Sequence, residues 1–161
     1  MWLPDRRTFL VSLAALAGCG FTPVYGPQGG GSKLLNAVAL EAPDDRYDYD
    51  FNKRFEERLG RGSGPYALKV DFELGTTGLG SLADGQTTRY RLSGRASYAL
   101  TPVGSEDVLI VGRTDSFTSY SATGSTAATQ AAERDARRRL MVILADRVID
   151  RLLIDADTLP E

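Results

Sequence analysis

The single cysteine of the chain, Cys19, follows a run of small residues, Leu16-Ala17-Gly18, in a position where its thiol can do chemistry. A basic pair, Arg6 and Arg7, and a short apolar stretch precede it, which is the layout of a secretory signal with its cleavage site. The stretch is too short for a transmembrane helix, which needs about 20 apolar residues. A thiolate is a nucleophile, so Cys19 can take up a diacylglycerol as a thioether, and cleavage before it frees an amine for another acyl chain. We interpret this segment as a bacterial lipobox and Cys19 as the lipid attachment site; the alternative is a small buried core cysteine.

Two features near Cys19 concern export and destination. Residues 5–10, Asp-Arg-Arg-Thr-Phe-Leu, resemble a twin-arginine signal, but paired arginines are also common in ordinary secretory signals, so both routes stay open. Gly20 stands where enteric bacteria place an aspartate to hold lipoproteins at the inner membrane, and this favours the outer membrane. Because two or more acyl chains give stable anchoring, we expect a lipid-anchored protein on the periplasmic side of the outer membrane in a Gram-negative envelope.

Composition limits the classes of partner and chemistry. The chain has 161 residues, with 19 basic side chains, 21 acidic side chains and no histidine. Removal of the predicted signal peptide, residues 1–18, takes away Asp5, Arg6 and Arg7, which leaves 17 basic and 20 acidic side chains and a formal charge of −3. A nucleic-acid-binding protein is usually strongly basic, so we expect no nucleic-acid partner. With its cysteine lipidated the domain has no disulfide, and nothing in the sequence predicts a cofactor or a metal.

Three arginines, Arg89, Arg91 and Arg95, recur at odd positions of an alternating stretch and therefore share one face of a predicted strand. Guanidinium groups bind phosphate in a bidentate fork, and residues two apart on a strand lie about 6.5–7 Å apart. This row can bind the phosphates of a phosphorylated lipid head group. The alternative is a solvated face whose arginines pair with carboxylates across the sheet, each pair contributing little. Those carboxylates are Asp71, Glu73 and Asp115.

A second basic cluster, Arg134, Arg137, Arg138 and Arg139, lies on a predicted long helix. Three consecutive helical residues span about 200°, so these side chains cannot all point one way. Acidic residues three or four positions away favour pairing along the polar side of the helix, with a partner contact as the alternative.

None of the remaining polar clusters in the sequence predicts the active site of an enzyme. The acidic residues 44, 45, 48 and 50 lack the glycine and the distal glutamate of an EF-hand loop, so helix capping explains them better. Serines and threonines cluster from Thr114 to Thr129, but without histidine they form no Ser-His pair. A Ser-Lys pair stays formally open with the lysines at 33, 53 and 69.

Periodicity and turn residues predict one domain after a lipidated tether, residues 19–33, whose part 26–32 is rich in glycine. Strands are expected at 34–40, 66–74, 89–100 and 108–120, and helices at 47–59 and 126–154. Past Arg113 the alternation of the last strand blurs, which allows a bulge or an edge position. A loose connection is expected at 75–85 and a short tail at 155–161. The order β-α-β-β-β-α predicts an α+β two-layer sandwich, with two helices on one face of a mostly antiparallel four-stranded sheet and a single domain at 34–154.

The opening of the mature chain, Cys19-Gly20-Phe21-Thr22-Pro23-Val24-Tyr25-Gly26, together with this order of elements, resembles the alphaproteobacterial type of the LptE family. Members of that family are outer-membrane lipoproteins that work with the LptD β-barrel in lipopolysaccharide assembly. The resemblance implies a plug inside that barrel, a role in its assembly and binding of lipopolysaccharide near its phosphates. It makes Arg89, Arg91 and Arg95 the natural phosphate contacts and residues 75–85 the tip that points into the barrel.

Other functions remain compatible with the same features. A lipid-anchored accessory or pilot protein of another envelope complex, such as a secretin or a lipid transporter, would share the anchor and the fold class. A surface-anchored hydrolase is disfavoured by the lack of histidine and of convergent carboxylates, and a structural spacer would bind no lipopolysaccharide.

Overall fold

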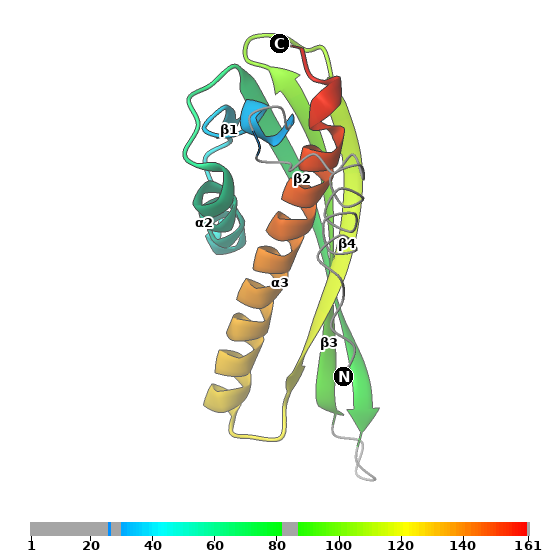
Figure 1. Ribbon diagram of the computed structural model, residues 1–161. Helices are drawn as coiled ribbons and strands as arrows, with labels where there is room; N and C mark the ends of the chain where they lie inside the picture. The colour runs from blue at the N-terminus through cyan, green and yellow to red at the C-terminus, as the bar shows by residue number, and fades with distance from the viewer. Residues whose placement is uncertain (1–25, 27–29, 82–86, 161) are drawn as a thin grey trace, which may run out of the picture.

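The computed structural model describes Gly26 and residues 30–81 and 87–160 of the chain. The elements are η1 (Gly30–Lys33), β1 (Val38–Leu40), α2 (Arg46–Leu59), β2 (Tyr66–Ser81), β3 (Thr87–Pro102), β4 (Ile110–Ser121), α3 (Thr126–Asp155) and η2 (Ala156–Thr158), where η marks a short 3₁₀ helix. Figure 1 shows α2 and α3 on the same face of a single sheet. The predicted β-α-β-β-β-α order and the α+β sandwich are confirmed.

The four strands follow the order β1-β2-β3-β4, so β1 and β4 are the edges of the sheet. β1 runs parallel to β2, and the other two pairings are antiparallel. Pairing between β2 and β3 extends from Tyr66 opposite Pro102 to Ser81 opposite Thr87. Because side chains alternate along each strand, the sheet has a core face under the helices and an outer face on the opposite side.

Helix α2 begins and ends where its capping residues predict. The Asp45 side chain accepts hydrogen bonds from the backbone N–H groups of Tyr47 at 2.6 Å and Asp48 at 2.9 Å. Gly60 follows the helix with a φ of 82°, a left-handed backbone that favours glycine. The residues that α2 buries recur at the predicted spacing of four and are Phe51, Phe55 and Leu59.

Helix α3 packs along the core face of β3 and β4. It begins after Ser125, whose side chain accepts a hydrogen bond from the backbone N–H of Ala128. A Cβ atom at Gly94 of β3 would lie 3.0 Å from Leu144 Cδ1 and 3.1 Å from Leu140 Cδ2, so this glycine permits the helix to approach closely. The buried stripe of α3 includes Ala136, Leu140, Leu144, Val148 and Leu152.

The predicted loose connection at 75–85 is wrong in its first half. β2 continues through the glycine- and threonine-rich residues 75–81, with register shifts around Gly80. Backbone pairing with β3 keeps this segment extended although its side chains alone would favour a loop. The rest of the expected connection, residues 82–86, lies outside the described residues.

Both ends of the domain also differ from the prediction. Residues 30–33, expected in the tether, form η1, and Lys33 Nζ donates a hydrogen bond to the carbonyl of Leu159 at 2.7 Å. Ala156–Thr158, expected in a tail, form η2, and Ala156 and the following Leu159 are buried. The first strand is shorter than expected, because Leu34 packs in the core after η1 and Asn36 turns the chain with a φ of 55°. The predicted signal peptide, Cys19 and most of the expected tether lie outside the described residues.

The blurred pattern of β4 reflects an edge position. Its register with β3 is continuous from Leu100 opposite Ile110 to Arg89 opposite Ser121. Polar residues occupy core-facing positions, where Thr114 and Ser116 are buried and Thr118 Oγ1 donates to the carbonyl of Ala136 at 3.1 Å. Among the helices that the structure describes, none is long and apolar enough to cross a membrane.

Candidate functional site: the outer face of the sheet

The outer face of the sheet holds all three arginines that the sequence singled out. Arg89, Arg91 and Arg95 lie on β3, the long central strand, and each is exposed. Their neighbours on β2 and β4 follow from the register of the two antiparallel pairings. Six cross-strand rows therefore divide this face into two halves of different charge.

The half of the outer face next to β1 is electrically balanced. Its rows, read from β2 through β3 to β4, are Glu73-Arg95-Asp115, Asp71-Ser97-Arg113 and Lys69-Ala99-Val111. Arg95 Nη1 lies 2.9 Å from Glu73 Oε2, with the two side chains 48% and 72% exposed. The solvated ion-pair alternative thus holds for Arg95, which pairs with one carboxylate and stands opposite another.

The half of the outer face near the β2–β3 hairpin end carries net positive charge. Its rows are Gly75-Ser93-Phe117, Thr77-Arg91-Ser119 and Gly80-Arg89-Ser121, with no carboxylate among the described residues. We call these nine residues the hairpin half. Cross-strand contacts therefore leave Arg89 and Arg91 with no described acidic partner, unlike Arg95.

Within the hairpin half, Arg91 is held by an aromatic ring. Its guanidinium carbon lies 4.2 Å from the centroid of Phe117, whose side chain is 59% exposed. Stacking over a ring orients a guanidinium while its N–H donors stay available for a second ligand. Arg139 of α3 also approaches this area, because its Nη2 lies 3.5 Å from the carbonyl oxygen of Ser119.

The hairpin half combines the chemistry that a phosphorylated amphiphile requires. Arg89 and Arg91 are two residues apart on one strand face, about 6.5–7 Å, and can each donate two hydrogen bonds to a phosphate. The hydroxyl groups of Thr77 and Ser119 are additional donors, and Phe117 offers apolar surface. The Ser121 hydroxyl already donates to the carbonyl of Thr88 at 3.4 Å. Phe117 and these hydroxyls were not predicted from the sequence. Their only sequence signal is their odd position on β2 or β4, which becomes meaningful once the register with β3 is known.

The second basic cluster pairs mainly along its own helix, as the acidic neighbours predicted. Arg137 Nη2 lies 2.6 Å from Glu133 Oε1, and its guanidinium carbon lies 5.4 Å from the centroid of Tyr47. Partial burial lowers the pKa of Arg137, but the hydrogen bonds and charge interactions with Glu133 and Tyr47 together outweigh this effect and raise the pKa of this arginine. Arg138 and Arg139 both pair with Asp135.

The acidic cluster before α2 serves as a cap. Besides the two bonds of Asp45, the Asp48 side chain accepts a hydrogen bond from the backbone N–H of Asp44 at 3.2 Å. No group of three metal-binding side chains is found in the part of the chain that the structure describes. Asp45 and Asp48 therefore cap the start of α2.

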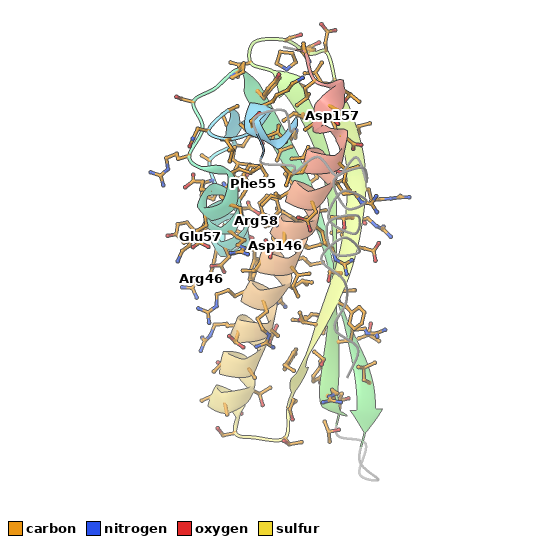
Figure 2. All side chains as sticks on the ribbon, in the orientation of Figure 1. Arg46, Phe55, Glu57, Arg58, Asp146 and Asp157 are labelled. Atoms are coloured by element: carbon orange, nitrogen blue, oxygen red, sulfur yellow. The ribbon has the colours of Figure 1, made fainter. Side chains whose placement is uncertain are left out.

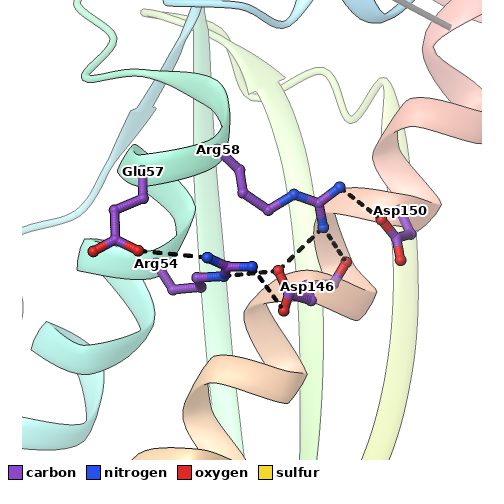
Figure 3. Close-up of polar contacts among 5 residues, drawn as sticks. All are labelled: Arg54, Glu57, Arg58, Asp146 and Asp150. Carbon is purple, nitrogen blue, oxygen red and sulfur yellow. Dashed lines mark hydrogen bonds and ion pairs between the residues drawn. The ribbon is translucent and has the colours of Figure 1, made fainter.

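A separate charge cluster, absent from the predictions, joins α2 to α3. Figure 2 places Arg58 and Asp146 between the two helices, and Figure 3 shows their contacts. Asp146 Oδ1 lies 2.9 Å from Arg54 Nε and 3.1 Å from Arg58 Nη1, and Arg58 Nη2 lies 3.0 Å from Asp150 Oδ1. The hydrogen bond with Asp146 raises the pKa of Arg54. This cluster pairs its charges internally and fastens one helix to the other.

Solved structures share this fold at low identity. A protein of Caulobacter crescentus CB15 assigned as a lipoprotein has a TM-score of 0.65 and 18% identity, covering 80% of this chain and 96% of its own. The minor lipoprotein of Acinetobacter baumannii has a TM-score of 0.56 and 16% identity, covering 77% of this chain and 92% of its own. The rare lipoprotein B of Shewanella oneidensis has a TM-score of 0.54 and 11% identity, covering 72% and 91%.

Comparison of the sequence with known proteins and with models of protein families identifies the family of this chain. None of the proteins of curated function matches the chain. The sequence model of LptE, described as lipopolysaccharide-assembly, matches residues 35–152, which include both long helices almost entirely and all four strands. The chain therefore belongs to the LptE family of lipopolysaccharide assembly.

Proposed function

We propose that this protein is a lipid-anchored, non-enzymatic component of lipopolysaccharide assembly at the outer membrane. In this proposal Cys19 carries the lipid, and the domain works with an LptD-type β-barrel as a plug and assembly factor. The hairpin half binds the phosphates of lipopolysaccharide. The LptE family membership supports the pathway. The observation that carries the binding site is the pair Arg89 and Arg91, which stand without a described acidic partner beside Phe117.

Of the three arginines predicted from the sequence, Arg89 and Arg91 contribute more to phosphate binding than Arg95 does. A phosphate that bound Arg95 would displace the ion pair with Glu73 and approach Asp115 across the strand, so the gain is partly cancelled. A phosphate at Arg89 or Arg91 meets hydroxyl groups and an aromatic ring instead. Charge-assisted hydrogen bonds contribute about 1.5–3 kcal/mol each, so losing both arginines would weaken binding on the order of 100-fold or more.

Binding of lipopolysaccharide by matched variants tests the site. We expect Arg89→Ser with Arg91→Ser to lose most of the binding, and Arg95→Ser to retain it. The variant with all three replaced should bind no better than the double variant. All should unfold at nearly the wild-type temperature, since the three side chains are exposed. Wild-type affinity in the triple variant would exclude the arginines as phosphate contacts.

Co-purification tests the partner. With a tag placed after Glu161 and outer membranes solubilised in mild detergent, we expect a large β-barrel in near-equal amount. A secretin or a transporter subunit in its place would keep the lipoprotein assignment but move the protein to another envelope complex.

The anchor has its own test. Cys19→Ala should yield an unlipidated, mislocalised precursor that retains residues 1–18. A membrane-bound product of mature size from this variant would contradict lipid attachment at Cys19.

A further inference from the structure

The edge of β2 that faces β1 is open over most of its length. β1 pairs with β2 only from Val38 opposite Tyr66 to Leu40 opposite Leu68, and the chain then leaves the sheet. Figure 1 shows β1 near the end of the sheet where β2 begins, while β2 continues toward the opposite end. Residues 69–81 of β2 therefore have no neighbouring strand on this side among the described residues. An edge of this length, with unpaired N–H and C=O groups, is a template for pairing with another chain.

Alternate residues of β2 direct their backbone groups to this open edge. Tyr66 donates its N–H to the carbonyl of Ala37 at 3.1 Å, on the β1 side, so even-numbered residues face this edge and odd-numbered residues bond to β3. The register with β3 is regular as far as Gly78, so the same direction continues along the strand. Beyond β1, the residues that face the open edge are Val70, Phe72, Leu74 and Thr76.

The opposite edge of the sheet, along β4, is partly blocked by α3. Ala122, which follows β4, donates its N–H to β3, so even-numbered residues bond to β3 and odd-numbered residues of β4 face the free edge. Two of these odd-numbered residues already use their carbonyls. Arg139 Nη2 lies 3.5 Å from the carbonyl oxygen of Ser119, and Arg147 Nη1 donates to the carbonyl of Asp115. Basic side chains laid over an edge oppose the addition of a strand, so β2 offers the more accessible edge.

A groove lies along the open edge where β1 ends. The chain between β1 and α2, the first turn of α2 and the first half of β2 line it, and its volume is about 390 Å³. Pre-formed binding sites have volumes of about 300–1,000 Å³, so side chains of an added strand have room here. Phe72 and Leu74 offer apolar contacts in the groove, and Leu74 is 40% exposed.

The charge of the groove favours a basic occupant. The charged residues that line it are Glu41, Asp44, Asp45, Asp48, Asp71 and Lys69. Asp45 and Asp48 also cap α2, but the other three carboxylates still outnumber the single lysine. Basic side chains on an added strand would therefore be attracted to this edge, and acidic ones repelled.

We propose that an extended, basic segment of the β-barrel partner adds to the sheet as a fifth strand along residues 70–76 of β2. The identity of the partner chain rests on the proposed function. Backbone hydrogen bonds along the edge supply affinity, and the acidic groove selects the side chains of the segment. Strand pairing fixes register and direction, so this contact sets the orientation of the domain within its partner.

Residue-resolved hydrogen exchange tests the pairing, with the mature chain measured alone and in the complex co-purified from outer membranes. In the chain alone, the even-numbered N–H groups of residues 70–76 should exchange much faster than the odd-numbered groups of residues 71–75, which bond to β3. In the complex we expect the even-numbered groups to exchange about ten-fold more slowly or less. The odd-numbered N–H groups of residues 113–119, on the β4 edge, are the matched control and should change little.

Substitutions test whether the edge holds the partner. Thr76→Pro removes an N–H that β3 does not use and places a ring where the added strand must approach, so several-fold less β-barrel should co-purify. Val111→Pro is the matched control, because its N–H faces the β4 edge and its side chain is 75% exposed, and it should retain the wild-type amount. Glu41→Lys with Asp44→Lys reverses charge beside the groove and should also lower the yield. Thermal unfolding of each variant confirms that the domain is folded.

The outcomes separate the strand pairing from the choice of partner. If a β-barrel co-purifies with the wild type but the even-numbered groups stay unprotected, the pairing is refuted and the partner stands. If these groups are already protected in the chain alone, a segment of this chain or a second copy fills the edge, and the proposal is again refuted. An unchanged yield with the two lysine substitutions would refute the basic character of the segment. If no β-barrel co-purifies with the wild type, the proposed partner is wrong and the pairing falls with it.

Discussion

Replacement of Asp146 by alanine should loosen α2 from α3. Asp146 is the shared acceptor of two arginines, with Oδ1 at 2.9 Å from Arg54 Nε and 3.1 Å from Arg58 Nη1. Its Oδ2 lies 3.3 Å from Arg54 Nη2, which makes the Arg54 contact bidentate. Without this carboxylate, two guanidinium groups from adjacent turns of α2 lie close together and have lost the negative charge that both contact.

The size of the loss follows from the partial burial of this cluster. The side chains of Arg54, Arg58 and Asp146 are 34%, 26% and 31% exposed. Fully exposed ion pairs contribute about 0.2–1 kcal/mol, whereas removing one partner of a fully buried pair costs about 3–5 kcal/mol. With about a third of each side chain in water, we expect a loss between these limits, about 2 kcal/mol. For a domain of this size that corresponds to a fall of about 4–8 °C in the unfolding temperature.

Thermal and urea unfolding of the unlipidated domain measure this loss. Asp150→Ala is the matched control, because Asp150 lies on the same helix, pairs with Arg58 alone at 3.0 Å and is 60% exposed. It should cost under about 0.5 kcal/mol. A double-mutant cycle with Arg54→Ala isolates the pair energy. If Asp146→Ala cost no more than Asp150→Ala, the carboxylate would not be the link between the helices, and the reasoning would be refuted.

Three further predictions concern the core and its caps. Gly112→Ala should cost about 1–3 kcal/mol in urea unfolding, because its Cβ would lie 2.5 Å from Tyr98 Cζ, and adding Tyr98→Val should remove most of that cost. Burial, with a further effect of Asp155, raises the pKa of Tyr98, so the folded state disfavours the phenolate. Stability from this group is complete below the unfolded pKa of about 10 and falls as the pH rises above it, and Tyr98→Phe should flatten that fall between neutral and strongly alkaline pH. Asp45→Ala should cost about 1 kcal/mol in thermal unfolding, with helix loss seen by circular dichroism, because two backbone N–H groups of α2 lose their acceptor.

The order of elements was predictable because local signals agree with the fold. Asp45, Gly60 and Ser125 flank the helices as caps, and their positions depend on sequence neighbours alone. The extension of β2 through residues 75–81 was not predictable, since glycine and threonine there favour a loop until β3 supplies the hydrogen bonds. The same holds for η1 and η2, which lie side by side in the fold although they stand at opposite ends of the domain's sequence.

The sequence predicted which face of β3 carries the candidate site, but not which side chains of the neighbouring strands lie beside it. Alternation along β3 placed Arg89, Arg91 and Arg95 together, yet it says nothing about which side chains lie beside them. That information is in the register, which brings Glu73 next to Arg95 and Phe117 near Arg91. Register depends on two strand pairings and on the length of the turns between them, so one strand's sequence cannot reveal it.

The division between the two faces of the sheet explains why binding and stability should respond to different substitutions. The core face meets α3 through close contacts such as those at Gly94, where an added methyl group would press on two leucines of α3 and on Leu74 of β2. The hairpin half of the outer face contacts no helix through Arg89 or Arg91, whose nearest described partners are the flanking strands. Replacing these arginines removes exposed charge, and surface changes of this kind shift stability by about 0.5 kcal/mol or less. A loss of lipopolysaccharide binding in a variant that unfolds like the wild type would therefore report on the site itself rather than on the fold.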